Sequence, residues 1–342
     1  MNYHNSSLYP INLPQENAKL FVGLLGCSIG TMPFTHLGLP MGTTRPRVVD
    51  FAPLGDRVER RLIASSLFLP QGGMLTLIIY VLSSIPTYYM CSLQLSVSVA
   101  KAIDTARKNC LWRGNNPSSS RKSLASWEIV FRPKVKGGLG IINLRVQNTT
   151  LLLKHLVKFY KGEDLPWVQL IWNSYYGIKV PHMIWNKGSF WWRDIIALSD
   201  IFRGISRCTV RTGSSALFWD DPWNEEVGCL TFSNLFSVAL DKKQSVQQLS
   251  SHPLEDCFPL ALRSQSYEEF LNLEEEISFL NLQDGKGDDW SFLWNSDRYT
   301  ANKFYKLTFM TVQTSKTFCL DMENTMCFED KKSLSGFFSM ID

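Results

Sequence analysis

The chain has 342 residues, of which 45% are hydrophobic and 13% are aromatic, and its formal net charge at pH 7 is +4. This composition excludes a chain that is disordered throughout, and the length allows two or three domains with cores of their own. The eight cysteines form no C-x-x-C pair and no two histidines have the spacing of ligands on one helix, so neither a zinc site nor a disulfide framework is supported.

The charge is unevenly distributed along the chain. Residues 1–161 contain 19 Lys and Arg against 6 Asp and Glu, a net charge of +13, whereas residues 162–342 contain 16 against 25, a net charge of −9. A basic first half favours a polyanionic partner. We place a domain boundary at Gly162, between a basic helical region (1–161) and an acidic mixed region (162–311), and we expect residues 312–342 to form a disordered tail.

The N-terminus carries neither the basic segment nor the apolar segment of a secretory signal, and the longest apolar run, Met74–Leu82, is too short to cross a bilayer. We therefore expect an intracellular protein, nuclear or cytoplasmic and not secreted, with no membrane as partner.

In the first half, the hydrophobic spacing predicts loop and strand over 1–30 and helices over 51–69, 74–84 and 97–112. The helix over 74–84 is apolar on nearly every side, so we expect it to be buried. In the helix over 97–112 we expect Val97, Ile103, Ala106 and Cys110 to point inward, and Lys101, Arg107 and Lys108 to point outward.

In the second half, Asn143 is placed to cap a helix over 144–160, and further helices are predicted from Leu165, from Gly188, over 267–282 and over 301–311. Cys208–Asp221 alternates around a Thr-Gly-Ser turn and predicts a β-hairpin, residues 241–264 are mostly loop, and Trp290–Trp294 with Arg298–Thr300 predicts a second small hairpin. The fold class is mainly α (α+β), with a helical bundle followed by a smaller domain of helices and β-hairpins.

The stretch 107–144 combines basic, aromatic and glycine-rich segments: R-K-N-C-L-W-R-G-N-N, a Ser/Arg/Lys bridge, and W-E-I-V-F-R-P-K-V-K-G-G-L-G-I-I-N-L. One interpretation is a cationic surface for a nucleic-acid backbone, and the other, which composition alone favours, is a solvated turn with buried tryptophans. On the first interpretation, the expected phosphate contacts are Arg107, Lys108, Arg113, Arg121, Lys122, Arg132, Lys134 and Lys136, and Trp112 and Trp127 are the candidates for stacking on bases.

This stretch resembles the region behind the polymerase core of plant LINE-type (non-LTR) retrotransposon reverse transcriptases. The resemblance extends over about residues 1–311 and is most specific in 33–42, 107–144 and 188–223. It implies that the first half corresponds to the thumb, which holds the duplex as it leaves the polymerase site. It also implies that the last helix stands where the family continues into a zinc-binding domain, which this sequence does not show.

A second segment, P-F-T-H-L-G-L-P-M-G at 33–42, resembles the primer-grip hairpin of the same family. Glycines permit a tight turn and a close approach of the backbone to a primer, and the side chains of Phe34 and Leu37 are expected to pack beneath the turn. The family has tyrosine where this chain has a histidine, which weakens a gripping role. The primer-grip-like residues are Phe34, His36, Leu37, Gly38 and Gly42.

Phe218-Trp219-Asp220-Asp221 superficially fits the aromatic-x-Asp-Asp signature of polymerases, in which paired carboxylates bind magnesium. We reject a catalytic role for the pair, because a third aspartate is required from an upstream strand and the upstream sequence here resembles primer grip and thumb. No Ser-His-Asp, Cys-His or paired-glutamate set supports another class of enzyme.

We therefore predict a truncated, retrotransposon-derived reverse-transcriptase fragment without the catalytic palm and the zinc-binding domain. It is not expected to be an enzyme on its own, and it is expected to use no cofactor or metal, because the magnesium ligands of the family are not in this chain. The expected partner is RNA or an RNA/DNA hybrid. The alternatives are a non-catalytic nucleic-acid-binding module, an inert relic and, least favoured, an active RNA-directed DNA polymerase.

Overall fold

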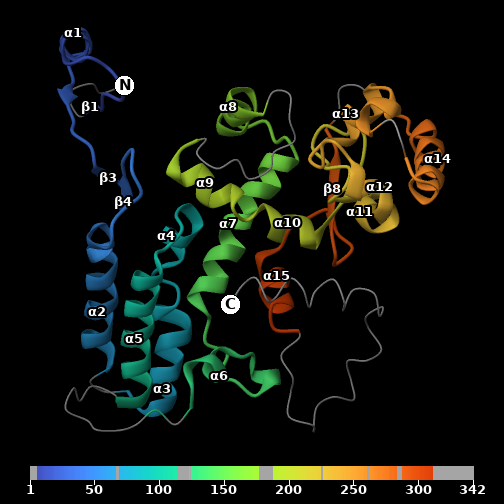
Figure 1. Ribbon diagram of the computed structural model, residues 1–342. Coiled ribbons are helices and arrows are strands. Elements are labelled where there is room, and N and C mark those ends of the chain that lie inside the picture. Colours follow the sequence, from blue (N-terminus) through green and yellow to red (C-terminus); the bar gives the residue numbers. More distant parts are fainter. Residues whose placement is uncertain are drawn as a thin grey trace. The chain divides into compact units, whose positions relative to one another are not determined.

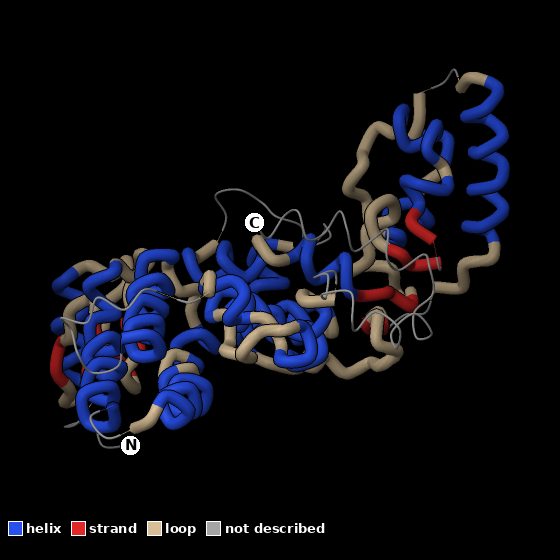
Figure 2. Tube along the Cα trace, turned by 90° about the horizontal axis from the view of Figure 1, so that it is seen from below, coloured by secondary structure: helices blue, strands red, loops and turns tan. Residues whose placement is uncertain are grey.

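The computed structural model describes residues 6–66, 69–113, 123, 125–176, 188–224, 226–259, 262–282 and 287–310. Helices make up most of this part of the chain, and the strands are short pieces that pair two by two (Figures 1 and 2). The prediction of a mainly α (α+β) fold is confirmed. The expected tail, 312–342, lies outside the described residues.

The described chain divides into two compact units. Unit 1 comprises Met1–Val130 with Ser189–Trp191, and unit 2 comprises Phe131–Gly188 with Trp192–Asp342. The boundary that charge predicts, at Gly162, falls inside unit 2, because the helix before it packs on later helices of that unit. The change of charge at residue 162 therefore does not coincide with the division seen in the contacts.

Unit 1 begins with two short parallel strands, β1 (Ser7–Leu8) and β2 (Ser28–Ile29), joined through α1 (Gln15–Leu25). The sequence prediction of loop and strand over 1–30 missed this helix. Only Ala18 is buried in α1, so its residues show no strong inward stripe. The helix ends at Gly26, which has a φ of 64° and donates its N–H to the carbonyl of Val22.

An antiparallel hairpin follows, formed by β3 (Phe34–His36) and β4 (Leu39–Met41). Its two turn residues, Leu37 and Gly38, have φ values of 49° and 83°, and positive φ at both central positions is the pattern of a type I′ turn.

The core of unit 1 is helical. Helix α2 (Ala52–Ser66) packs against α5 (Val97–Arg113), and Leu54 and Val58, one turn apart on α2, are buried. The remaining elements of this core are η2 (Val48–Phe51), α3 (Gln71–Thr76), the π-helical η3 (Leu77–Leu82) and α4 (Thr87–Ser92).

In the stretch Gly72–Ser92, the elements α3, η3 and α4 follow one another. By length and composition this stretch could cross a membrane, whereas the run Met74–Leu82 alone is too short. No other helix in the described ranges meets that test. Ile78, Leu82 and Met90 are buried in the core of unit 1, whereas Tyr80 is exposed. The expectation that this helix is buried all round is therefore wrong at Tyr80.

In unit 2, α7 (Leu144–Tyr160) has the bounds that the sequence predicts. The side-chain oxygen of Asn143 accepts from the backbone N–H groups of Arg145 and Val146, at 3.0 and 3.4 Å, and so caps the helix. Helix α7 packs on α10 (Ser199–Ile205) and α15 (Ala301–Leu307). Two helices, α6 (Trp127–Phe131) and α9 (Phe190–Ile196), contain residues of both units. The other helices of unit 2 are η4 (Lys134–Lys136), α8 (Pro166–Tyr175), α11 (Gly228–Thr231), α12 (Ser233–Val238), α13 (Val246–Ser251), η5 (Leu254–Cys257) and α14 (Ser264–Ser278).

The two hairpins predicted in the second half are wrong in their pairing. Strand β5 (Ser206–Thr209) pairs antiparallel with the distant β8 (Asp289–Phe292), in the register Ser206↔Phe292 to Thr209↔Asp289. A small ladder of β6 (Pro222–Asn224) and β7 (Glu226–Val227) lies farther along the chain. Within 241–264, expected to be mostly loop, the helices α13 and η5 form.

Candidate nucleic-acid interface

The turn Arg132–Gly140 in unit 2 is a tightly bonded loop that leads into α7. The N–H of Gly140 donates to the carbonyl of Arg132 at 2.9 Å, and the N–H of Lys136 donates to the carbonyl of Pro133 at 2.8 Å. A Cβ at Gly138 would lie 2.1 Å from the Arg132 carbonyl oxygen, so only glycine fits there. The backbone of the turn is therefore fixed by close contacts.

This turn presents cations to solvent. Lys134 and Val135 are exposed, and Arg132 and Lys136 are half-buried. Lys134 has no ion-pair partner among the described residues. A turn with a fixed backbone and an exposed, unpaired lysine is the kind of surface that can contact phosphates, which lysine binds as a point charge.

In unit 1, the C-terminal half of α5 also carries exposed positive charge, on Lys108 and Arg113. Trp112 is half-buried, and its indole N–H is buried with no hydrogen-bond partner among the described residues. Trp127, at the start of α6, is half-buried too. Neither tryptophan is fully buried, so burial does not prevent either ring from stacking on a base.

Arg107 does not belong to this surface, contrary to its predicted outward orientation. Its side chain is 0% exposed, Nη1 donates to Asp104 at 2.7 Å, and Nη2 donates to the hydroxyl of Ser83 at 3.1 Å. The guanidinium also lies over the ring of Trp127, at 5.9 Å. In this structure Arg107 therefore connects α5 to the end of η3 and to α6, and it is closed to a phosphate. Val97, predicted inward, is likewise wrong, because it is exposed.

The predicted contacts are divided between the two units. Lys108, Arg113, Trp112 and Trp127 belong to unit 1, and Arg132, Lys134 and Lys136 belong to unit 2. The remaining two, Arg121 and Lys122, lie outside the described residues.

The primer-grip-like residues form the hairpin β3–β4 and its turn. Phe34 stacks on Tyr9, with ring centroids 3.6 Å apart, and the hydroxyl of Tyr88 donates to the Leu37 carbonyl at 3.0 Å. The Leu37 side chain is 78% exposed at the tip, so the expectation that it packs beneath the turn is wrong. The other members of the set are placed as follows: His36 is exposed, Gly38 lies at the tip and Gly42 follows β4.

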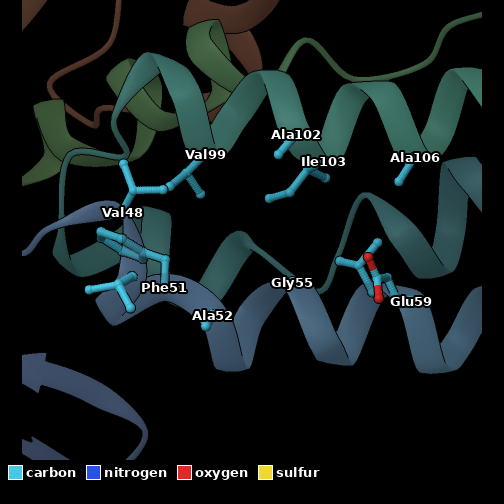
Figure 3. A pocket seen from close by; sticks show the side chains of 11 residues that line it. Val48, Phe51, Ala52, Gly55, Glu59, Val99, Ala102, Ile103 and Ala106 are labelled. Carbon is cyan, nitrogen blue, oxygen red and sulfur yellow. The ribbon is translucent and has the colours of Figure 1, made fainter.

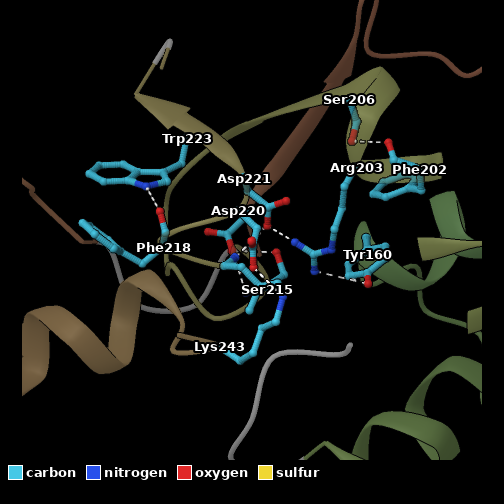
Figure 4. Close-up of polar contacts among 12 residues, drawn as sticks. Tyr160, Phe202, Arg203, Ser206, Ser215, Phe218, Asp220, Asp221, Trp223 and Lys243 are labelled. Carbon is cyan, nitrogen blue, oxygen red and sulfur yellow. Dashed lines mark hydrogen bonds and ion pairs between the residues drawn. The ribbon is translucent and has the colours of Figure 1, made fainter. Parts of the chain in front are cut away.

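The adjacent aspartates have different environments (Figure 4). Asp221 is completely buried and pairs with the buried guanidinium of Arg203, and it also accepts the N–H of Leu217 at 2.6 Å. Asp220 lies at the surface and pairs with Lys243 at 2.8 Å. Burial raises the pKa of the Asp221 carboxyl, and the Arg203 charge opposes that shift.

Asp221 and Asp220 therefore pair with different cations, one inside the fold and one at the surface, and they do not form a metal site together. Among the described residues, no group of three or more His, Cys, Asp or Glu side chains is placed to hold a metal ion.

The structure also shows a polar site that sequence reasoning missed. Asp288 is buried, and its carboxylate accepts the backbone N–H groups of Arg211, Thr212, Gly213 and Ser215 at 2.7 to 3.0 Å, together with the Ser215 hydroxyl at 2.7 Å. The Thr-Gly-Ser loop is therefore held by hydrogen bonds to this carboxylate and not by the strand pairing of a hairpin. The sequence gives no local signal for it, because donor and acceptor are more than 70 residues apart.

Unit 1 contains an apolar groove of about 330 Å³ between α2 and α5 (Figure 3). Phe51, Val58 and Ile103 are among its lining residues, and Glu59 is the only charged side chain among the described residues that line it. A groove with one negative and no positive group does not suit a phosphate.

No protein-family model matches the chain. The chain is similar to an Arabidopsis thaliana protein named "Putative ribonuclease H protein", with 28% identity over 179 residues. The match includes 51% of this chain and 29% of that protein, so the chain spans less than a third of its relative's length.

Proposed function

We propose that this chain is a retroelement-derived protein that resembles the thumb and following region of plant LINE-type reverse transcriptases, and that it binds RNA or an RNA/DNA hybrid without catalysing polymerisation. The motifs in 33–42, 107–144 and 188–223 support the LINE-type origin. The similarity to a protein named for ribonuclease H supports a link to nucleic-acid metabolism in general.

The observation that carries the binding proposal is the turn Arg132–Gly140. Its backbone is fixed by Gly138 and by the hydrogen bond from Gly140 to Arg132, and it holds Lys134 in solvent without an acidic partner in the described chain. A phosphate that docks on Lys134 has no ion pair of that side chain to displace, and it meets a backbone that is already fixed.

The non-catalytic part of the proposal rests on the use of the aspartates. The carboxylate of Asp221 is engaged by Arg203 inside the fold, and that of Asp220 by Lys243. Binding a magnesium ion at this pair would require both ion pairs to be broken.

The test is binding of a labelled RNA/DNA hybrid to the full chain at low salt. Lys134→Glu is expected to weaken binding, and Gly138→Ala is expected to weaken it without any change of charge, because the added methyl forces the turn to change shape. The matched control is Lys242→Glu, which makes the same change of charge at an exposed site in the acidic part of the chain. Equal effects of Lys134→Glu and Lys242→Glu would contradict a specific role for the turn.

Catalysis is assayed separately, as magnesium-dependent incorporation of nucleotides. The proposal predicts no incorporation by the folded full chain. Incorporation that is lost in Asp220→Asn would overturn the non-catalytic assignment.

A further inference from the structure

Helix α7 is the most enclosed long helix of unit 2, and it carries exposed cations: Arg145 near its start and two lysines in its second half. Leu152, Leu153, Leu156 and Phe159 are all nearly inaccessible, whereas Lys154 and Lys158 are exposed. The helix contains no Asp or Glu anywhere between Leu144 and Tyr160. The usual surface arrangement, in which lysine alternates with acidic residues at helical spacing, is absent from this helix.

The two lysines are four positions apart and therefore lie one above the other on the same face. Lys161 follows at the C-cap and continues the row. The ammonium groups of Lys154 and Lys158 have no ion-pair partner among the described residues. That of Lys161 donates to the carbonyl of Asp297. We call Lys154, Lys158 and Lys161 the lysine row.

We propose that the lysine row is a second contact for the phosphates of the same nucleic acid, so that one strand is held both at the turn Arg132–Gly140 and along α7. This inference rests on the proposed function. A separation of four residues corresponds to about 6 Å along a helix axis. Phosphates of one strand of a duplex advance by about 3.4 Å along its axis. Two flexible lysines at that separation can therefore reach neighbouring phosphates of one strand.

The lysine row ends at Lys161, next to acidic side chains. A polar cavity of about 300 Å³ beside Lys161 is lined by Asp288, Asp289 and Asp297 among others. Asp288 is committed to the loop that it holds, and Asp289 is paired with Arg211, whereas Asp297 is exposed and has no ion-pair partner among the described residues. A polyanion would be repelled there, so the contact is expected to use Lys154 and Lys158 and to end at Lys161.

The other polyanionic surface that could attract lysines is an anionic membrane. A helix that lies on a membrane needs an apolar face open to the lipid beside its basic face. The apolar face of α7 is buried inside unit 2, and α10 and α15 pack on the helix. The structure therefore favours nucleic acid over lipid.

The experiment uses the full chain with Lys154→Glu/Lys158→Glu, and a labelled RNA/DNA hybrid as the probe. The matched control is Lys242→Glu/Arg263→Glu, which changes the charge by the same amount at two exposed positions in the acidic part of the chain. The proposal predicts a loss of affinity of about tenfold or more at low salt, and a fall of about 2 in the slope of log affinity against log salt, for the row variant only. Both variants are expected to melt close to the temperature of the unchanged protein, because all four side chains are exposed and the control loses only a surface contact of Lys242 with the ring of Phe236, at 4.6 Å.

Three results would contradict the proposal, and they are distinguishable. If Lys134→Glu weakens binding while the row variant behaves as its control, only the lysine row is wrong. If the unchanged folded protein does not bind the hybrid at all, the proposed function and the lysine row both fail. If the row variant loses binding to vesicles that contain phosphatidylserine but keeps its binding to the hybrid, the row is a membrane contact instead.

Discussion

The guanidinium of Arg203 donates to the carboxylate of Asp221 inside unit 2, where both side chains are almost completely buried. Arg203 also donates to the hydroxyl of Tyr160 at 3.3 Å and lies over that ring at 5.2 Å (Figure 4). The pair therefore joins α10, the end of α7 and the segment that carries the aromatic-x-Asp-Asp sequence. A sequence that suggests catalysis forms part of the core.

Removing one partner of this pair should be strongly destabilising. Asp221→Ala leaves Arg203 buried without its counter-charge, and we expect a loss of about 3–5 kcal/mol in the free energy of unfolding, measured by denaturant titration. Asp220→Ala removes only a surface pair with Lys243, and about 0–1 kcal/mol is expected. Equal effects of the two neighbouring substitutions would contradict the structural role of Asp221.

A second adjacent pair tests the loop anchored by Asp288. Asp288→Ala removes the acceptor of four backbone N–H groups, two of them buried, so we expect a loss of at least about 3 kcal/mol. Asp289→Ala removes an exposed pair with Arg211 and should change stability by about 0–1 kcal/mol. Asp288→Asn is expected to fall between the two, because the amide keeps one acceptor oxygen. A wild-type melting temperature for Asp288→Ala would show that the loop does not need this carboxylate.

Arg107 and Lys108 are neighbours in α5 with opposite predicted behaviour. Arg107→Gln should destabilise unit 1, because the Asp104 carboxylate and the Ser83 hydroxyl lose a buried charged donor. Lys108→Gln should leave the melting temperature unchanged, since its side chain is exposed. The measurement is thermal unfolding followed by circular dichroism. Destabilisation by Lys108→Gln and none by Arg107→Gln would reverse the assignment of the two side chains.

Unit 2 should lose stability in alkali. Burial raises the pKa of Tyr176 to about 12, although the N–H that Trp192 donates to its hydroxyl opposes the shift, and burial also raises the pKa values of Tyr160 and Tyr299. In the window above the ordinary value of about 10, the unfolded chain releases protons that the folded chain keeps, so stability falls as pH rises from about 10 towards 12.

Denaturant titration at several pH values, with tyrosinate absorbance as a second readout, checks this expectation. Stability that stays constant up to pH 12 would mean that these phenols are open to water. Tyr80, which is exposed, provides the comparison, because Tyr80→Phe should not alter the pH profile.

The sequence predicts those elements whose signals are local. Helix α7 has the bounds that the sequence predicts, because Asn143 caps it, and its residues Leu152, Leu156 and Phe159 are buried at helical spacing. Helix α2 follows from the spacing of Leu54 and Val58 for the same reason.

The predictions that are wrong have two causes. Strand pairing depends on contacts between distant segments, and the orientation of Arg107 was predicted from its charge and not from its position on the helix. The pairing of β5 with β8 joins segments some 80 residues apart, and Asp288 supplies the acceptors that a local hairpin would have supplied. Arg107 could have been placed correctly, because it lies four residues after Ile103 and three before Cys110, two residues predicted to point inward. Its basic side chain suggested solvent, whereas Asp104, three residues earlier, provided the ion pair that permits burial.

Whether this fold binds a nucleic-acid backbone is decided by the salt dependence of hybrid binding by the full chain. About six phosphate contacts predict a slope near −5 in log affinity against log salt. A steep slope that becomes shallower in both Lys134→Glu and Lys154→Glu/Lys158→Glu is the result expected if the turn and the lysine row contact phosphates. No binding at low salt, by a protein shown to be folded by a cooperative melt, would contradict it.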